Sequence, residues 1–296
     1  MRCKSHLRKR VFKLKTLNNF TKILGTTMTL ALLFGVLISG CGSDNNSGPL
    51  GVTSNSTNAN VVAGNELASG FDASFKPTVA GVGHAAVELA SSFNYVVLAG
   101  STVTNTGATT ITGDLGLSPG SAVTGFPPGL LIGTQHISDP SADQAKLDLT
   151  IAYNDAAGRT LAPVSLSGNI GGMTLAPGLH KSTSGLEISS GDLTLDGKGN
   201  GNSVWIFQMA STLTTTSGRK VILSGGAKAA NVFWQVGTSA TLGTTSVFKG
   251  TIMADQSVTM NTGASLEGRV LARIGAVTLD GNTIVSPKRG KKPNRN

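Results

Sequence analysis

The chain has 296 residues, and its 24 Lys and Arg against 15 Asp and Glu give a formal net charge of +9. Two cysteines are too few for a disulfide framework or a four-thiolate zinc site. A charge of +9 would suit a nucleic-acid or acidic-membrane partner, so its distribution along the chain decides what it means.

The excess of basic residues lies in two short terminal segments. Eight basic residues fall in residues 1–22 and five in the last nine residues, whereas residues 23–287 hold eleven basic and all fifteen acidic residues. The middle of the chain is therefore slightly acidic. This distribution predicts a targeting signal and a basic tail, and it predicts no nucleic-acid partner for the folded part.

Residues 1–40 have the pattern of an export signal. A basic stretch leads into an apolar segment over 28–37, which is about half the roughly 20 residues that a membrane-spanning helix needs. The run Leu37-Ile-Ser-Gly-Cys41 resembles the bacterial lipobox, in which the cysteine becomes the lipidated first residue after cleavage. We therefore predict a lipoprotein-type signal peptide over 1–40 and an exported protein that Cys41 anchors to a membrane of the cell envelope. A plain signal peptide, which would release a secreted protein, is the alternative.

Two further segments are predicted to have no fixed structure. Residues 41–83 are rich in Ser, Asn and Gly and lack apolar periodicity, which is typical of a flexible tether. Residues 288–296 are predicted to form a basic, disordered and solvated tail.

Residues 84–287 contain short apolar and β-branched runs separated by glycine. Runs such as 95–98, 204–207 and 232–234 suit strands and are too short for helices. Residues 239–250 can be laid over 257–268, with a similar segment at 276–284. Thr241, Thr259 and Thr278 then lie 18 and 19 residues apart.

A repeat of this length is about one coil of a three-sided β-solenoid. Each coil cannot bury its own apolar side, so the coils form a core by stacking. The alternative is a β-sandwich in which the threonine spacing is coincidental.

One helix is predicted, from Pro140 to Ala157. Asp139 can accept hydrogen bonds from the first helical amides, Pro140 suits the first helical position, and Gly158 suits the position just past the end. The helix should lie along one side of the solenoid, because its small and apolar residues fall on one stripe. These are Ala142, Ala145, Leu149, Ala152 and Ala156.

The sequence shows no metal-binding or nucleophile motif in a context that supports it. His84, His136 and His180 lie far apart, without the spacing of metal ligands. Residues 116–120 match the GxSxG pattern of hydrolases, but the residue after the serine is Pro119, which lacks the N–H that an oxyanion hole requires. We expect no catalytic residue, no metal and no cofactor.

A polysaccharide lyase is a further functional hypothesis, because some polysaccharide lyases are β-solenoids. Arg269 and Arg273 would suit it only beside clustered carboxylates. The acidic residues are scattered, mostly next to glycine, where side-chain bonds to the backbone favour turns. They are Asp114, Asp192, Asp196, Asp255 and Asp280.

Threonine-rich segments recur at 106–109, 214–216, 244–246 and 262–265. If coils stack about 4.8 Å apart, these side chains form a regular ladder of hydroxyl and methyl groups on a flat, rigid and nearly uncharged face. Such a face can order a layer of water. The alternative is that threonine is present only because it favours strands.

The chain resembles the DUF3494 family of bacterial and fungal ice-binding proteins over about Val87 to Pro287. The segments that carry the resemblance are 111–119, 124–126, 152–159, 204–207, 231–235, 250–254 and 268–279. The resemblance implies a mainly β fold, a discontinuous right-handed β-solenoid (triangular β-helix) with one long α-helix packed alongside. It also implies an antifreeze protein that adsorbs to ice through a flat β-face and inhibits crystal growth.

Some family members carry a T-A/G-x-T/N pattern on that face. Thr106 to Thr109 match it, Thr262 to Ser265 depart at the last residue, and Thr238 to Thr241 depart at the second. The candidate ice-binding residues are Thr106, Thr109, Thr241, Thr244, Thr245, Thr262 and Ser265.

The alternative function is a cell-surface adhesin or structural module that binds polysaccharide or neighbouring cells. An exposed row of Trp or Tyr would favour it. Trp205 and Trp234 both lie in apolar runs, so we predict that they belong to the core.

Overall fold

The computed structural model describes residues 84–287. The predicted signal peptide with Cys41, the tether and the basic tail lie outside the described residues. No helix among residues 84–287 is long and apolar enough to cross a membrane.

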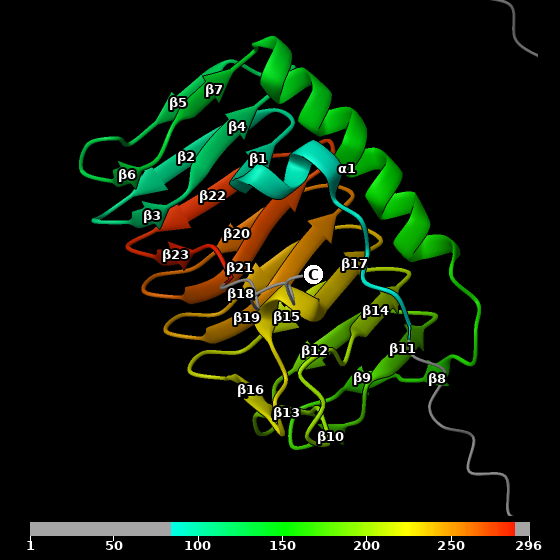
Figure 1. Cartoon of the computed structure of the whole chain (residues 1–296). Helices are drawn as coiled ribbons and strands as arrows, with labels where there is room; N and C mark the ends of the chain where they lie inside the picture. Colours follow the sequence, from blue (N-terminus) through cyan, green and yellow to red (C-terminus); the bar gives the residue numbers. More distant parts are fainter. Residues whose placement is uncertain (1–83, 288–296) are drawn as a thin grey trace, which may run out of the picture. The chain divides into compact units, whose positions relative to one another are not determined.

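The domain is a stack of triangular coils with one helix along its side (Figure 1). All strand pairs among residues 84–287 are parallel, so the predicted solenoid is confirmed and the sandwich, which requires antiparallel sheets, is wrong. The strands are β1 (Tyr95–Ala99), β2 (Thr102–Thr106), β3 (Thr110–Thr112), β4 (Asp114–Leu117), β5 (Ala122–Thr124), β6 (Leu130–Ile132), β7 (Gln135–Ile137), β8 (Val164–Ser165), β9 (Gly168–Asn169), β10 (Thr174–Leu175), β11 (Gly178–Ser182), β12 (Leu186–Ile188), β13 (Leu193–Asp196), β14 (Trp205–Met209), β15 (Leu213–Thr215), β16 (Val221–Ser224), β17 (Val232–Val236), β18 (Ala240–Leu242), β19 (Val247–Ala254), β20 (Val258–Met260), β21 (Ser265–Ala272), β22 (Val277–Asp280) and β23 (Thr283–Val285). The helices are α1 (Pro140–Gly158) and the short 3-10 helices η1 (Ala90–Asn94) and η2 (Ala229–Asn231).

The strands form three faces. The threonine sheet has the order β5-β2-β22-β20-β18-β15-β12-β9. The helix-side face contains β8, β11, β14, β17, the second halves of β19 and β21, then β1, β4 and β7. The third face contains β10, β13, β16, the first halves of β19 and β21, then β23, β3 and β6. β19 and β21 turn the corner between these two faces at Gly250 and Gly268, where a Cβ on Gly268 would lie 1.8 Å from the Gly250 carbonyl oxygen.

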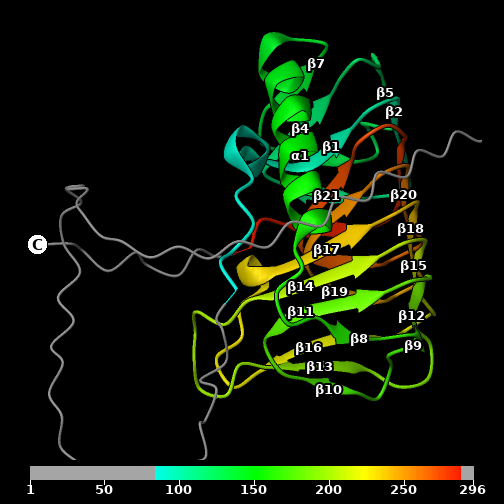
Figure 2. The same ribbon diagram turned by 90° about the vertical axis from the view of Figure 1, so that its right-hand side faces the viewer.

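The coils do not stack in sequence order. The N-terminal strands β1, β2 and β3 pair with β21, β22 and β23, so the last coil of the chain lies in the middle of the stack. Helix α1 then runs from β7 to β8 and carries the chain from one end of the stack to the other (Figure 2). The solenoid is therefore discontinuous, as the resemblance implies.

Helix α1 begins as predicted and ends differently. Asp139 accepts a hydrogen bond from the Ala142 amide at 2.8 Å, and the predicted apolar stripe is buried. Gly158 is the last residue of the helix rather than the residue beyond it. The helix end is satisfied from the solenoid instead, because Nε2 of the buried Gln208 lies 2.6 Å from the Ala156 oxygen and 2.8 Å from the Arg159 oxygen.

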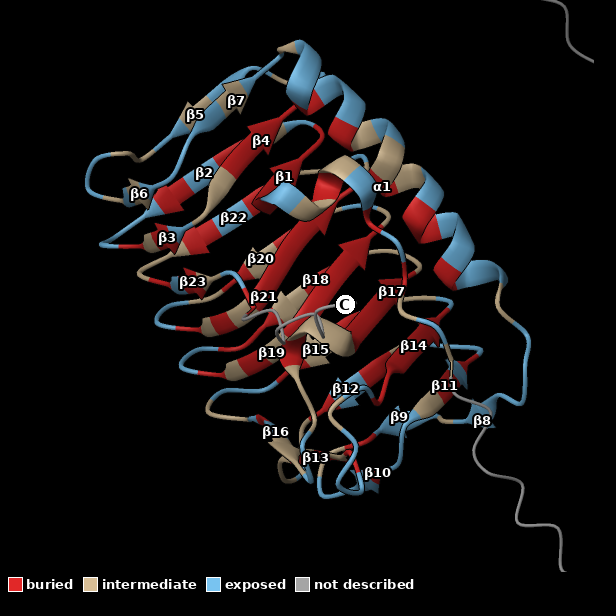
Figure 3. Cartoon of the chain, viewed as in Figure 1, coloured by how far each residue is buried: buried red, intermediate tan, exposed pale blue. Residues whose placement is uncertain are grey.

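Two apolar cores share the strands of the helix-side face. Alternate residues of the central strands of this face point into the triangle or out toward α1 and η1, so β1, β14 and β17 are buried along their whole length (Figure 3). Inside the triangle, Phe207 stacks on Trp234 with ring centroids 3.9 Å apart, and His180 stacks on Phe207 at 5.1 Å. Trp205 and Trp234 are both fully buried, which confirms their predicted place in the core.

Lys146 ties the helix to the corner between the helix-side face and the threonine sheet. Its Nζ donates hydrogen bonds to the Ala272 and Arg273 carbonyl oxygens, the second at 2.6 Å. Burial, together with the nearby charge of Arg273, lowers the pKa of Lys146 to about 8.

This shift predicts a pH effect on stability. The unfolded lysine keeps its proton up to its ordinary pKa of 10.5, whereas the folded one loses it near 8. Raising the pH through this window therefore favours the folded state. We expect the free energy of unfolding of the wild type, relative to that of Lys146→Met, to rise by about 2–3 kcal/mol across the window. Urea denaturation at a series of pH values measures it, and parallel pH profiles for the two proteins would contradict it.

Candidate binding surface

A single rank of threonines crosses six neighbouring strands of the threonine sheet. The strand register places these residues directly beside one another, in the order Thr124, Thr104, Thr278, Thr259, Thr241 and Thr214. At a strand spacing of about 4.8 Å, the rank is about 24 Å long. We call it the central threonine rank.

The rank follows from strand alternation. In β20, Val258 and Met260 point inward and are fully buried, while Thr259 between them points outward. The same pattern recurs in β18 and β22. Because side chains alternate across a strand, the apolar neighbours that fill the core fix the outward direction of each threonine. The backbone ladder and the stiff χ1 of threonine then hold the hydroxyl and methyl groups in place.

Five of the seven predicted residues lie in this rank or along its border. Thr241 belongs to the central threonine rank. Thr106, Thr244, Thr245 and Thr262 are exposed at the corner between the threonine sheet and the third face, where backbone bonds stack them in order with Asp280. The amide of Gly281 donates to the Thr106 oxygen, that of Gly263 to the Asp280 oxygen, and that of Thr245 to the Thr262 oxygen, at 2.9–3.0 Å.

Two predicted residues lie off this surface. Ser265 is half-buried at the start of β21, on the third face. Thr109 is fully buried, and its hydroxyl accepts a hydrogen bond from the Asn282 amide at 2.9 Å. The inclusion of Thr109 among the ice-contacting residues is therefore wrong, because a side chain inside the corner cannot touch an external surface.

Five residues of the rank were absent from the predicted set. Thr259 and Thr278 were detectable, because the 18- and 19-residue spacing already aligned them with Thr241. Thr104 and Thr124 were not, because they precede the helix in the chain and join the rank only through the pairing of β2 with β22.

Charge is excluded from the central threonine rank. Asp280 lies at its border, where its carboxylate accepts a hydrogen bond from the Thr262 hydroxyl. The next residue in register below Thr214 is Glu187, followed by Asn169. The central threonine rank itself is thus uncharged over six coils, and the next side chain in register is acidic.

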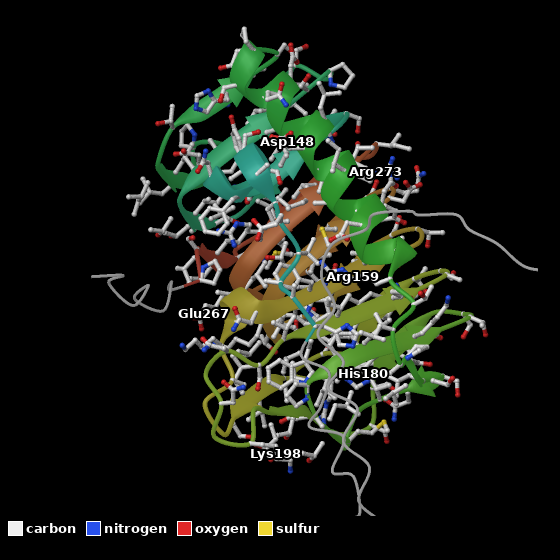
Figure 4. The ribbon with its side chains drawn as sticks, turned by 45° about the vertical axis from the view of Figure 1, so that its right-hand side comes forward. Asp148, Arg159, His180, Lys198, Glu267 and Arg273 are labelled. Atoms are coloured by element: carbon white, nitrogen blue, oxygen red, sulfur yellow. The ribbon has the colours of Figure 1, made fainter. Side chains whose placement is uncertain are left out.

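Charged groups elsewhere in residues 84–287 do not converge on a reactive site (Figure 4). Arg273 pairs with Asp255 at 2.6 Å, Lys249 with Glu267 at 2.9 Å and Arg159 with Asp155 at 2.6 Å. The scattered aspartates bond to turns: Asp114 accepts from Thr134, Asp192 from Lys220 and Asp196 from Lys198. No group of three or more potential metal ligands occurs in the described part of the chain.

The other predicted motifs are structural. Ser118 of the GxSxG segment is buried and donates to the Asp143 carboxylate of helix α1. Arg269 is buried, with its Nε donating to the Phe93 oxygen at 2.9 Å. His180 is buried in the aromatic stack, and burial lowers its pKa. Within residues 84–287 no Phe, Tyr or Trp is exposed, so this region lacks the row of aromatic rings that polysaccharide binding would favour.

The chain is similar to known ice-binding proteins in both sequence and structure. Residues 97–285 match the sequence model of the ice-binding-like family. An ice-binding protein of Nostoc sp. (strain HG1) is 47% identical over 66% of this chain and 72% of its own length. One of Flavobacterium frigoris (strain PS1) is 37% identical over 90% of this chain and the whole of its own length. The crystal structure of an ice-binding protein from an Antarctic biological consortium is 61% identical, covers 69% of this chain and 93% of its own, and superposes with a TM-score of 0.69.

Proposed function

The chain belongs to the ice-binding-like family, and on that premise we propose that it adsorbs to ice through the threonine sheet and inhibits crystal growth and recrystallisation. Ice-binding proteins are not enzymes, so family membership also confirms the prediction of no catalytic activity. The observation that carries the proposal is the central threonine rank, six outward side chains in register on a flat parallel sheet.

Four physical properties of the rank support adsorption. Its side chains are already ordered by the sheet, so contact with ice costs little conformational entropy. On contact with ice, each methyl group removes apolar surface from water, which is favourable. Each hydroxyl can donate and accept, so it can join the hydrogen-bond network of an ordered water layer. An uncharged plane avoids the strongly held hydration shell that an ion would keep.

Recrystallisation inhibition tests this function directly. Micromolar purified chain should arrest the coarsening of ice grains in a frozen sucrose film, whereas the same concentration of serum albumin should not. Coarsening at the same rate in both films would end the proposal.

We also propose that the protein is exported and anchored by a lipid on Cys41. Support comes from the lipobox-like run Leu37-Ile-Ser-Gly-Cys41, which follows a basic stretch and a short apolar segment.

Fractionation of a bacterial host tests the anchor. The wild-type chain should be found with the membranes and incorporate labelled palmitate, and Cys41→Ser should lose the label and leave the membrane fraction. Ser39→Ala, a change of similar size next to the cleavage point, serves as the control that retains both. Palmitate labelling of Cys41→Ser equal to that of the wild type would contradict the anchor.

A further inference from the structure

The central threonine rank stops at an acidic residue although the sheet continues. Strand β12 pairs in register with β15, with Leu186 beside Leu213 and Ile188 beside Thr215. Leu186 and Ile188 are buried like their counterparts in the coils above. The position between them, beside Thr214, is Glu187. The scaffold for a seventh threonine is therefore complete, and only the side chain differs.

Glu187 has no structural role that would explain it. It is exposed, and none of the hydrogen bonds or ion pairs found in residues 84–287 involves its carboxylate. Its backbone oxygen accepts from the Ile170 amide, a bond that any residue would make. The other glutamate at a strand position, Glu267, is paired with Lys249 at 2.9 Å. Glu187 is thus a free carboxylate at the end of an uncharged rank of threonines.

We propose that Glu187 sets the lower limit of the ice-contacting surface and holds the protein's affinity for ice below what its scaffold permits. The inference rests on the proposed function. A carboxylate keeps a tightly bound hydration shell, and ice does not take an ion into its lattice, so water around Glu187 cannot join an ice-like layer. The glutamate side chain is also longer than that of threonine, and it is exposed.

Replacing Glu187 with threonine should extend the rank from six coils to seven. One more methyl group then leaves water on adsorption, which corresponds to about a four-fold gain in affinity. The concentration of Glu187→Thr that just arrests recrystallisation should accordingly be about four-fold lower than that of the wild type. Threonine favours strands, and circular dichroism with the melting temperature verifies the fold.

Two further variants make the measurement specific. Glu88→Gln removes an exposed glutamate from the segment beside the helix-side face, between the buried Val87 and Leu89, and should leave the arresting concentration unchanged. Thr214→Glu shortens the uncharged rank from six threonines to five, and it should raise the arresting concentration at least about four-fold.

The outcomes separate this inference from the function on which it rests. A wild type that never arrests recrystallisation overturns the proposed function. An active wild type with a folded Glu187→Thr of equal potency overturns the role of Glu187 alone, and so does an active Thr214→Glu of wild-type potency.

Discussion

Replacing Thr259 with tyrosine should weaken recrystallisation inhibition by more than ten-fold without unfolding the protein. Thr259 lies near the middle of the central threonine rank, between Thr278 and Thr241. A tyrosine ring at position 259 would project beyond the neighbouring threonines and keep both Thr278 and Thr241 from contacting ice. With a factor of about four for each methyl contact, losing contact over three coils exceeds ten-fold.

Matched tyrosine substitutions locate the surface. Thr262→Tyr adds the same ring at the exposed corner, so it should weaken adsorption less than Thr259→Tyr. Ile222→Tyr adds it to the third face, where Ile222 is 42% exposed, and should have no effect. If Ile222→Tyr were as damaging as Thr259→Tyr, the threonine sheet would not be the contact surface.

Trp234→Ala should produce the largest loss of stability. Trp234 is fully buried between Phe207 and Phe248, and its Nε1 donates to the Lys249 oxygen at 2.9 Å. Truncating a buried tryptophan to alanine costs about 3–5 kcal/mol, because apolar burial is lost and a cavity remains. For a domain of this size, the melting temperature should fall by roughly 6–20 °C.

Thermal denaturation followed by circular dichroism measures this loss. Ile222→Ala removes an exposed side chain from a strand of the third face and should shift the melting temperature by only about 1–2 °C. A similar small shift for Trp234→Ala would mean that the aromatic stack does not hold the coils together.

Local signals in the sequence predicted most of the fold. Asp139 and Pro140 predicted the start of α1, and the alanine stripe predicted its buried side. The spacing of Thr241, Thr259 and Thr278 predicted stacked coils, and the strand register confirms it. These features depend on residues near one another in the chain or on a regular period.

The remaining features depend on contacts between distant segments. Gly158 was predicted to lie just past the end of α1. Instead, Gln208 donates hydrogen bonds to the carbonyl groups at that end, because β14 passes beside the last turn of α1. Thr109 matched a surface pattern but is buried where β3 meets Asn282. Thr104 and Thr124 join the rank only because the first coils stack on the last one. No local pattern encodes such pairings.

Thermal hysteresis of the purified wild-type chain beside Thr259→Tyr tests the central claim most directly. A nanolitre osmometer measures the gap between the melting and freezing points of a single ice crystal in each solution. The wild type should hold the crystal at constant size below its melting point, and Thr259→Tyr should show a much smaller gap at the same concentration. Equal gaps in the two proteins would contradict adsorption through the central threonine rank.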